Sequence, residues 1–273
     1  MKNKRFFLRK YLKKTFNLIF LKIFKKINSL LFERYLNVYR NDQKVFEIKN
    51  MGSITRARAL TFETKEPETI EWIESFSEND KLLDIGANIG IYSLYAAHLG
   101  KSVISIEPDV LNFALLNLNI KKNLLSQKIT AYGIAIHDKE KFSTLNSSSF
   151  EWGSALSSFD NHHDFQGNEF IPVHSQGVYG LPLDKFISKI NLKPNHIKID
   201  VDGNEFLILK SAINTLLSRE LKSILVELDE EHPNYSKSLN IIESSGLKLF
   251  SKTHAAIFDN SQFCSSYNHI FYK

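Results

Sequence analysis

From residue 80 onward, short apolar runs alternate with segments in which apolar residues recur every three or four positions. The short runs predict buried strands at Lys81–Ile85, Ser102–Ile106, His196–Asp200 and Ser223–Leu228. The longer periodic segments predict helices at Gly90–Leu99, Asp109–Lys122, Asn204–Leu217 and Tyr235–Ser244. Strands that alternate with helices in this way are typical of an α/β fold, in which a mostly parallel sheet is covered by helices on both faces.

The remaining apolar segments extend this pattern. Residues 129–136 are rich in residues that favour strands, and Lys141–Leu145 is expected to return antiparallel to them. Lys248–Ser251 and His269–Tyr272 predict the closing strands. Residues 146–180 follow neither period and are rich in Ser, His, Asn and Gly. A long insertion of this kind in a compact domain is either flexible or functional.

The first 45 residues differ from the rest of the chain. Residues 1–40 hold 12 Lys and Arg and one acid, whereas residues 41–273 hold 23 basic and 29 acidic residues. Apolar residues between Phe16 and Leu31 recur at helical spacing, opposite most of the lysines, which predicts a basic amphipathic helix. Its longest uncharged apolar run, Leu18–Leu21, is far shorter than the roughly 20 residues of a membrane span.

This arm has two interpretations. It lies either in an anionic membrane surface, as basic amphipathic helices do, or against the folded domain or a partner chain. No small-residue cleavage site follows it, which argues against a secretory signal. The sequence thus predicts an arm over residues 1–45 and a domain over residues 46–273, with its core from about residue 80. A cytoplasmic location is expected, at the inner face of the membrane if the first interpretation holds.

Composition narrows the classes of function. The acidic balance of the domain argues against a nucleic-acid substrate, because nucleic-acid binders usually carry a basic patch on the domain itself. The single cysteine, Cys264, cannot form an intramolecular disulfide, and a cysteine-based metal site is disfavoured. The nine histidines show no ligand spacing. Arg56 and Arg58 either meet an anionic substrate group or are solvated.

The turn after the first core strand reads Asp84-Ile-Gly86-Ala-Asn88-Ile-Gly90. In open parallel sheets such a turn lies at the edge where ligands bind, and glycine lets backbone N–H groups approach a ligand closely. Asn88 stands where the G-x-G-x-x-G fingerprint of dinucleotide binding needs its middle glycine, and the phosphate-binding G-x-x-x-x-G-K-[ST] is absent. A dinucleotide and a nucleoside triphosphate are therefore both disfavoured.

Two carboxylates at strand ends indicate a different ligand. Asp84 suits an ammonium group, and Glu107, which precedes Pro108 at the end of the next strand, suits ribose hydroxyls. Ribose and an ammonium group without a pyrophosphate describe S-adenosylmethionine. The alternative is structural, with glycines that only form a tight turn and a Glu107 that is solvated.

Four motifs carry a resemblance to a known family. Residues 82–95, which contain D-I-G-A-N-I-G, resemble motif I of class I methyltransferases and closely resemble that of the FkbM family. The stretch I-K-I-D-V-D-G-N-E at 197–205 resembles K-I-D-V-E-G-x-E of that family, with Asp202 in place of the commoner glutamate. Residues 182–187 and 65–72 resemble two further stretches. The resemblance covers about residues 50–250 and implies a Rossmann-like class I methyltransferase fold, with seven strands of which the last is antiparallel.

The resemblance implies an S-adenosylmethionine-dependent O-methyltransferase. The candidate cofactor-binding residues are Asp84, Gly86, Asn88, Gly90, Glu107 and Pro108. A hydroxyl acceptor needs a base within hydrogen-bond reach, and the candidates are Asp200, Asp202 and Glu205, at the end of the strand across the cleft. These acids could instead cap the following helix. They would also suit Mg²⁺, with Asp200 and Asp202 as ligands, although no other ligand can be identified.

The acceptor is less well defined. The leading hypothesis is a sugar hydroxyl on a surface polysaccharide or a lipid-linked glycan precursor, because the basic arm favours a membrane-proximal substrate. Residues 146–180 and 251–267 are expected to form walls of the acceptor pocket. The alternatives are another acceptor, such as a hydroxyl of a secondary metabolite or RNA, and a binding protein that retains the fold without catalysis. The sequence does not define the oligomeric state.

Overall fold

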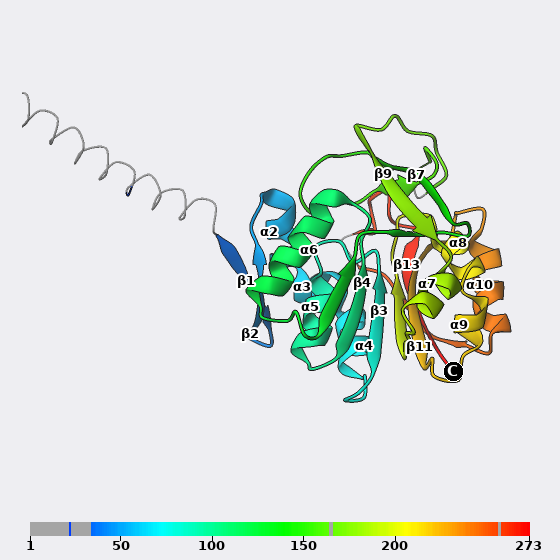
Figure 1. Ribbon diagram of the computed structural model, residues 1–273, viewed down its shortest axis with the longest axis horizontal. Helices are drawn as coiled ribbons and strands as arrows, with labels where there is room; N and C mark the ends of the chain where they lie inside the picture. The colour runs from blue at the N-terminus through cyan, green and yellow to red at the C-terminus, as the bar shows by residue number, and fades with distance from the viewer. Residues whose placement is uncertain (1–21, 23–33, 164–165, 256–257) are drawn as a thin grey trace, which may run out of the picture.

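The computed structural model describes residues 22, 34–163, 166–255 and 258–273. Its centre is a seven-stranded sheet in the order β12-β13-β11-β10-β3-β4-β5 (Figure 1). These strands are β3 (Lys81–Ile85), β4 (Ser102–Ile106), β5 (Ile129–Tyr132), β10 (His196–Ile199), β11 (Ser223–Asp229), β12 (Lys248–Thr253) and β13 (Ser266–Tyr272). β13 is antiparallel to both of its neighbours, whereas β10 and β3 run parallel at the centre. Strand order reverses between β10 and β3, so the ligand-binding edge lies at their carboxyl ends.

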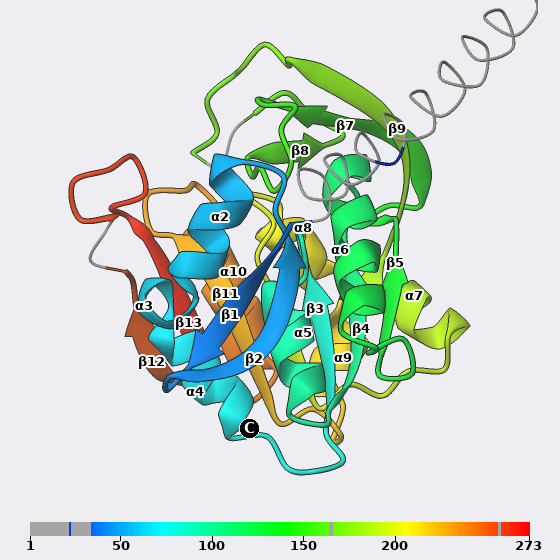
Figure 2. The same ribbon diagram turned by 90° about the vertical axis from the view of Figure 1, so that its left-hand side faces the viewer.

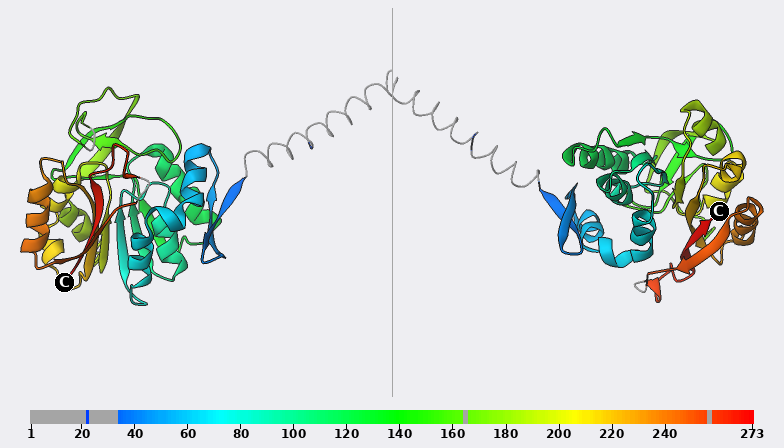
Figure 3. Two further views of the ribbon diagram at one scale, coloured as in Figure 1. Left: turned by 180° about the vertical axis from the view of Figure 1, so that it is seen from behind. Right: turned by 90° about the horizontal axis from the view of Figure 1, so that it is seen from below.

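Helices cover both faces of this sheet (Figures 1 and 3). One face carries α4 (Pro67–Glu74), α5 (Ile91–His98) and α6 (Val110–Lys122), and the other carries α7 (Leu183–Lys189), α8 (Glu205–Lys210), α9 (Ile213–Leu217) and α10 (Tyr235–Ser244). Each face has its own buried apolar cluster, with Leu94 and Leu116 in the first and Leu209 and Ile242 in the second. The predicted α/β fold, with an antiparallel last strand and helices on both faces, is confirmed.

The region before the core differs from the prediction. Residues 35–45 do not continue a helical arm, because β1 (Tyr35–Arg40) and β2 (Gln43–Lys49) form an antiparallel hairpin, followed by α2 (Ser53–Leu60) and α3 (Phe62–Lys65). Val38, Phe46 and Ile48 are buried at alternate positions, and Asn41 and Asp42 take the left-handed conformation that a two-residue hairpin turn requires. The amphipathic helix predicted between residues 16 and 31 lies outside the described residues, apart from Lys22.

A second sheet lies at the carboxyl ends of the central strands (Figure 2). Its order is β6-β9-β7-β8, made of β6 (Ala135–Ile136), β7 (Lys141–Ser147), β8 (Ser157–Phe159) and β9 (His174–Leu181). The prediction that residues 141–145 pair with 129–136 is wrong, because residues 129–132 pair with β4 in the central sheet and β7 pairs with β8 and β9. The insertion at 146–180 therefore has strands of its own.

Two further details concern the helices. The helix expected over residues 204–217 is interrupted between α8 and α9, where Ser211 accepts the N–H groups of Leu183 and Asp184 at the start of α7. Among the described residues, no helix combines the length and the apolar character that crossing a membrane requires.

Candidate active site

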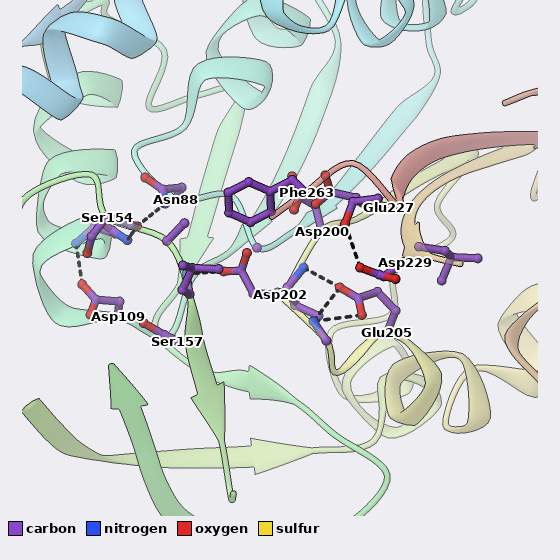
Figure 4. A pocket seen from close by; sticks show the side chains of 18 of the residues that line it. Asn88, Asp109, Ser154, Ser157, Asp200, Asp202, Glu205, Glu227, Asp229 and Phe263 are labelled. Atoms are coloured by element: carbon purple, nitrogen blue, oxygen red, sulfur yellow. Dashed lines mark hydrogen bonds between the residues drawn. The ribbon is translucent and has the colours of Figure 1, made fainter. Parts of the chain in front are cut away.

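A cavity of about 480 Å³ lies at the carboxyl ends of β3, β4, β10 and β11. Figure 4 shows its carboxylates gathered around Asp202 near the middle of the view. Seven carboxyl side chains belong to the described lining, namely Glu107, Asp109, Asp200, Asp202, Glu205, Glu227 and Asp229. The basic residues of the lining are Arg58, Lys65 and His232. The site is therefore rich in acids, although the chain as a whole is basic.

The structure brings most of the predicted site residues to this cavity. Gly86, Asn88, Glu107, Pro108, Asp200, Asp202 and Glu205 all line it, whereas Asp84 and Gly90 do not. Both irregular segments contribute to the wall as expected, through residues 154–157 of the insertion and through Phe258, Phe263 and Ser266 near the C-terminus.

The turn after β3 is fixed by its backbone. Gly86 has a φ of +83° and Asn88 one of +52°, and Gly86 and Ala87 both donate their N–H groups to the main-chain oxygen of Ile106. A Cβ added at Gly86 would lie 1.7 Å from the main-chain oxygen of Asp200. Glycine is therefore required here for two reasons, the left-handed backbone and the close approach of the segment after β10.

Glu107 is a buried carboxyl at the end of β4. Its Oε2 accepts the Asn88 N–H at 2.7 Å and its Oε1 accepts the Asp109 N–H at 2.8 Å. Burial raises the pKa of Glu107 to about 8, although these two hydrogen bonds act in the opposite direction. Each oxygen retains a lone pair, so the side chain can still accept hydrogen bonds from a ligand in the cavity.

Asp84 and Gly90 have roles behind the cavity wall. Asp84 is buried; its Oδ2 accepts the Ser93 hydroxyl at 2.5 Å, and its Oδ1 has no hydrogen-bond partner. Burial raises the pKa of Asp84. Gly90 begins α5 in the left-handed conformation, and a Cβ there would lie 2.4 Å from Leu116. Asp84 is thus not placed to meet an ammonium group in the cavity in this structure.

The three acids that follow β10 have different environments. Asp202 accepts the Leu156 N–H through Oδ2 at 2.7 Å, and burial together with the negative charge of Asp200 raises its pKa to about 6. Glu205, the first residue of α8, accepts the N–H groups of Val201 and Gly203. This is the capping role considered from the sequence, and burial raises the pKa of Glu205 to about 7.

Asp200 belongs to a buried charge network. Its Oδ2 lies 2.6 Å from Nζ of Lys198, a lysine that is only 1% exposed. Burial alone would raise the pKa of Asp200, but Lys198 and a hydrogen bond from Glu227 hold it well below its usual range. Burial and the charge of Asp200 raise the pKa of Glu227 well above its usual value. Glu227 is therefore the protonated member of the pair and Asp200 the ionised one.

The insertion is held over the cavity by side chains from distant elements. Asn88 and Asn112 both donate to the main-chain oxygen of Ser154, and Asn112 also accepts the Gly153 N–H. Arg58 donates to the main-chain oxygen of Gly153 at 2.9 Å. With the contact between Leu156 and Asp202, these bonds fix residues 153–156, which we call the clasped loop. Arg58 is therefore held by a contact with the protein backbone rather than fully solvated.

Lys198 and Glu227 were not predicted as site residues, although both carry a signal in the sequence. Lys198 stands between Ile197 and Ile199 in a buried strand, where an unpaired charge is very costly. Glu227 stands near the carboxyl end of β11, the strand whose Val226 pairs with Ile199. The pairing partner was not known from the sequence, so the proximity of Glu227 to Asp200 could not be derived.

The arrangement does not support the Mg²⁺ prediction. The described residues contain no group of three or more His, Cys, Asp or Glu side chains placed to hold a metal ion. Asp200 is instead paired with Lys198, and Asp202 is bound to the backbone of the clasped loop.

Comparisons with known proteins agree with this fold. The central sheet order, with its antiparallel strand between β11 and β12, defines the class I methyltransferase fold that the sequence implied. The chain matches the model of the methyltransferase FkbM domain over residues 84–254. It therefore belongs to the FkbM methyltransferase family. The predicted family is confirmed.

Solved structures give a fold-level likeness. The chain resembles methyltransferase FkbM from Methylobacillus flagellatus KT with 19% identity and a TM-score of 0.53, over 80% of this chain and 53% of that one. This chain thus spans about half the length of that protein. It also resembles fibrillarin from Aeropyrum pernix, solved with natively bound S-adenosyl-L-methionine, with 10% identity and a TM-score of 0.46, over 87% and 99% of the two chains. No curated protein matches the chain.

Proposed function

We propose that the protein transfers the methyl group of S-adenosylmethionine to a hydroxyl group of a sugar, in a surface polysaccharide or a lipid-linked glycan precursor. The observation that carries this proposal is one cavity lined both by Gly86, Asn88 and Glu107 and by the carboxyl groups of Asp200, Asp202 and Glu227. Figure 4 shows Asp202 between Asn88 and Glu227. One cavity can therefore hold a donor and an acceptor side by side.

The residues near β3 and β4 fit the donor. Glu107 can accept hydrogen bonds from ribose hydroxyls, and Gly86 and Asn88 of the turn line the cavity beside it. The acid-rich lining suits the positive charges of the sulfonium and ammonium groups. When bound, S-adenosylmethionine supplies a methyl group that is already activated, so the protein must chiefly align the donor with the acceptor.

Asp202 is the base that the geometry favours. Its Oδ2 is anchored by the Leu156 N–H, which leaves Oδ1 for the hydroxyl of the acceptor. A pKa of about 6 leaves the carboxylate ionised at neutral pH while it can still take up a proton. Glu205 is engaged by two backbone N–H groups and Asp200 by Lys198, so both are less suited to this role.

The sugar assignment has support from the wall around β11. Phe206, Tyr235, Phe258 and Phe263 line the cavity together with Glu227 and Asp229. Aromatic faces combined with carboxylate oxygens suit a ring that has apolar C–H faces and several hydroxyl donors.

The location near a membrane is proposed from the path of the chain. Residues 1–40 are strongly basic, and the main-chain oxygen of Arg34, just before the hairpin, accepts the Asn50 N–H at 2.9 Å. Asn50 lies three residues before α2, and Ile54, Ala57 and Arg58 of α2 line the cavity. Contact of the arm with an anionic membrane would therefore bring the membrane near the α2 wall of the site. Weaker binding to anionic vesicles after removal of residues 1–33 is the expected result.

Two assays test the function. Calorimetric titration should give micromolar binding of S-adenosylmethionine and none of NAD. Transfer of a labelled methyl group should then be measured to a panel of glycosides, polyprenyl-linked sugars, small non-sugar alcohols and RNA. Transfer only to the alcohols or to RNA would reject the sugar assignment.

The Asp202→Asn variant tests the base. The asparagine oxygen can still accept the Leu156 N–H, so affinity for S-adenosylmethionine should change by less than about threefold while turnover falls about 100-fold or more. Turnover of the wild-type enzyme should decline as the pH falls below about 6, because protonated Asp202 cannot accept a proton. Full turnover in the variant would mean that another group acts as the base.

A further inference from the structure

Lys198 lies behind the part of the cavity wall formed at the carboxyl ends of β10 and β11, and it determines the charge of that wall. Lys198 does not line the cavity, yet its buried ammonium lies 2.6 Å from Oδ2 of Asp200 and 5.1 Å from the centre of the Tyr92 ring. A buried lysine is tolerated only when it is paired. Lys198 therefore requires Asp200 to be ionised and fixes the position of its carboxylate.

The register of the sheet adds a second carboxyl. Because Ile199 pairs with Val226, the next residues, Asp200 and Glu227, extend side by side into the cavity and share a hydrogen bond. Two carboxyls at this separation cannot both be ionised. The pair therefore holds one proton and presents one negative charge, whose counter-ion is buried on the other side.

The lysine and the arginine of the described lining are paired with other groups, although the charge of Lys65 also acts on Asp200 and Glu227. His232, the third basic residue of the lining, has a pKa that burial lowers. Lys65 lies 2.7 Å from Glu66, whose other oxygen accepts the Tyr92 hydroxyl at 2.8 Å. Arg58 donates to the main-chain oxygen of Gly153 in the clasped loop. Both belong to α2 and α3 rather than to the β10 and β11 wall. An anionic group that reached this wall would face Asp200, Glu227 and Asp229.

We propose that the Asp200–Glu227 pair, held by Lys198, is a charge filter that restricts the methylated ring to sugars without an anionic substituent. This inference rests on the proposed function and narrows it. Neutral sugars and amino sugars are accepted, because their hydroxyl and ammonium groups donate to the ionised carboxylate. Uronates and phosphorylated sugars are rejected, because their charge would be desolvated next to a fixed negative group.

The test compares acceptors that differ by one substituent. Methyl transfer is measured from S-adenosylmethionine to p-nitrophenyl glycosides of the common hexoses, each as the neutral sugar, the 2-amino sugar and the uronate. We expect kcat/KM for the neutral and amino members to exceed that for the matching uronate by about 30-fold or more, since like charges a few ångströms apart repel strongly where water is partly excluded. Equal or better transfer to the uronates would overturn the filter and leave the sugar methyltransferase standing. Transfer to no sugar at all would reject the proposed function itself.

Two matched variants separate charge from shape. Asp200→Asn removes the negative charge and should reduce the ratio of neutral to uronate transfer by about 10-fold or more, whatever it does to the absolute rate. Glu227→Gln resembles the protonated acid and should keep the ratio. A ratio that changes in Glu227→Gln but not in Asp200→Asn would contradict the assignment. If Asp200→Asn does not fold, the wild-type ratio and the Glu227→Gln ratio still decide the question.

Discussion

The main-chain oxygen of Asp200 occupies the space that a side chain at Gly86 would need, since a Cβ there would lie 1.7 Å from it. The turn after β3 and the segment after β10 are therefore in direct backbone contact. The contact is reinforced by the hydrogen bond from Asp200 N–H to the main-chain oxygen of Ile85 at 3.1 Å. Any change that separates these two segments should disturb both parts of the cavity together.

Gly86→Ala is predicted to damage the site through this contact. The added methyl group must push β10 from β3, so we expect affinity for S-adenosylmethionine to fall at least about 10-fold and the protein to lose about 2 kcal/mol or more of stability. Gly100→Ala is the matched control, because Gly100 has a similar φ of +87° and nothing within 4 Å of the added Cβ. Titration calorimetry and chemical unfolding of both variants measure the difference. Equal losses would show that backbone strain, not the contact with Asp200, determines the effect.

Glu107→Gln should weaken cofactor binding. The NH₂ group that replaces one carboxyl oxygen would face a backbone N–H of Asn88 or Asp109, so the side chain loses a hydrogen bond and gains a donor–donor contact. A loss of about 10- to 100-fold in affinity for S-adenosylmethionine is expected. Glu78→Gln, at an exposed carboxylate just before β3, should leave the affinity unchanged. Binding by Glu107→Gln as tight as wild type would remove Glu107 from the cofactor site.

Asn112→Ala should loosen the clasped loop. Asn112 is buried and makes two hydrogen bonds to this loop: its amide donates to the main-chain oxygen of Ser154, and its side-chain oxygen accepts the Gly153 N–H. Hydrogen-exchange mass spectrometry should show faster exchange over residues 151–157, and S-adenosylmethionine should dissociate faster. Asn117→Ala is a control on the same helix, where the side chain bonds only within α6. Unchanged exchange in Asn112→Ala would mean that the other contacts suffice to hold the loop.

A second buried polar cluster predicts the response of stability to acid. His196 lies 3.0 Å from Asp80 and 2.7 Å from the Ser223 hydroxyl, which also accepts the Trp72 N–H. Burial lowers the pKa of His196 to about 4, although Asp80 acts in the opposite direction. All three partners are buried and none lines the cavity, so the cluster is structural.

The sign of this effect follows from proton uptake on unfolding. In the unfolded chain His196 takes up a proton below about pH 6.5, whereas the folded protein resists it down to about pH 4. Stability should therefore fall between pH 6.5 and 4, by about 3 kcal/mol at most from this group. The difference between the unfolding free energies of wild type and His196→Gln, measured against pH, gives the contribution of His196 alone. Glu107 and Glu205 contribute equally to both proteins, and their raised pKa values favour the folded state at low pH. Parallel pH curves for the two proteins would contradict this account.

The sequence allowed the ends of the central strands to be predicted well. The alternation of apolar and polar positions located β3, β4 and β10, and so placed Glu107, Asp200 and Asp202 at the ligand-binding edge. Those positions depend on local periodicity and on a general property of parallel sheets. The same reasoning placed Asp84 in the cavity, whereas it lies outside the lining. Successive side chains of a strand point to opposite faces, and the sequence did not show which face Asp84, the second-last residue of β3, would take.

Contacts between distant segments could not be predicted. Asn112 and Ser154 are 42 residues apart, and Leu156 and Asp202 are 46 apart. Neither pair leaves a periodic signal, since polar residues in loops have many equivalent partners. The hairpin at residues 35–49 was not predicted for another reason, because Tyr35 and Val38 continue the helical spacing of the basic arm beyond Leu31.

The position of β13 makes one end of the central sheet depend on the strand that comes last among the seven in sequence. Residues 266–272 insert between β11 and β12, and Asn268 donates a hydrogen bond to Glu68, 200 residues earlier in the chain. β11 and β12 are therefore joined by a strand that follows both of them in sequence. Phe263 and Ser266 of the cavity wall take their places only when this long-range pairing has formed, so completion of the sheet and completion of the cavity are expected to be coupled during folding.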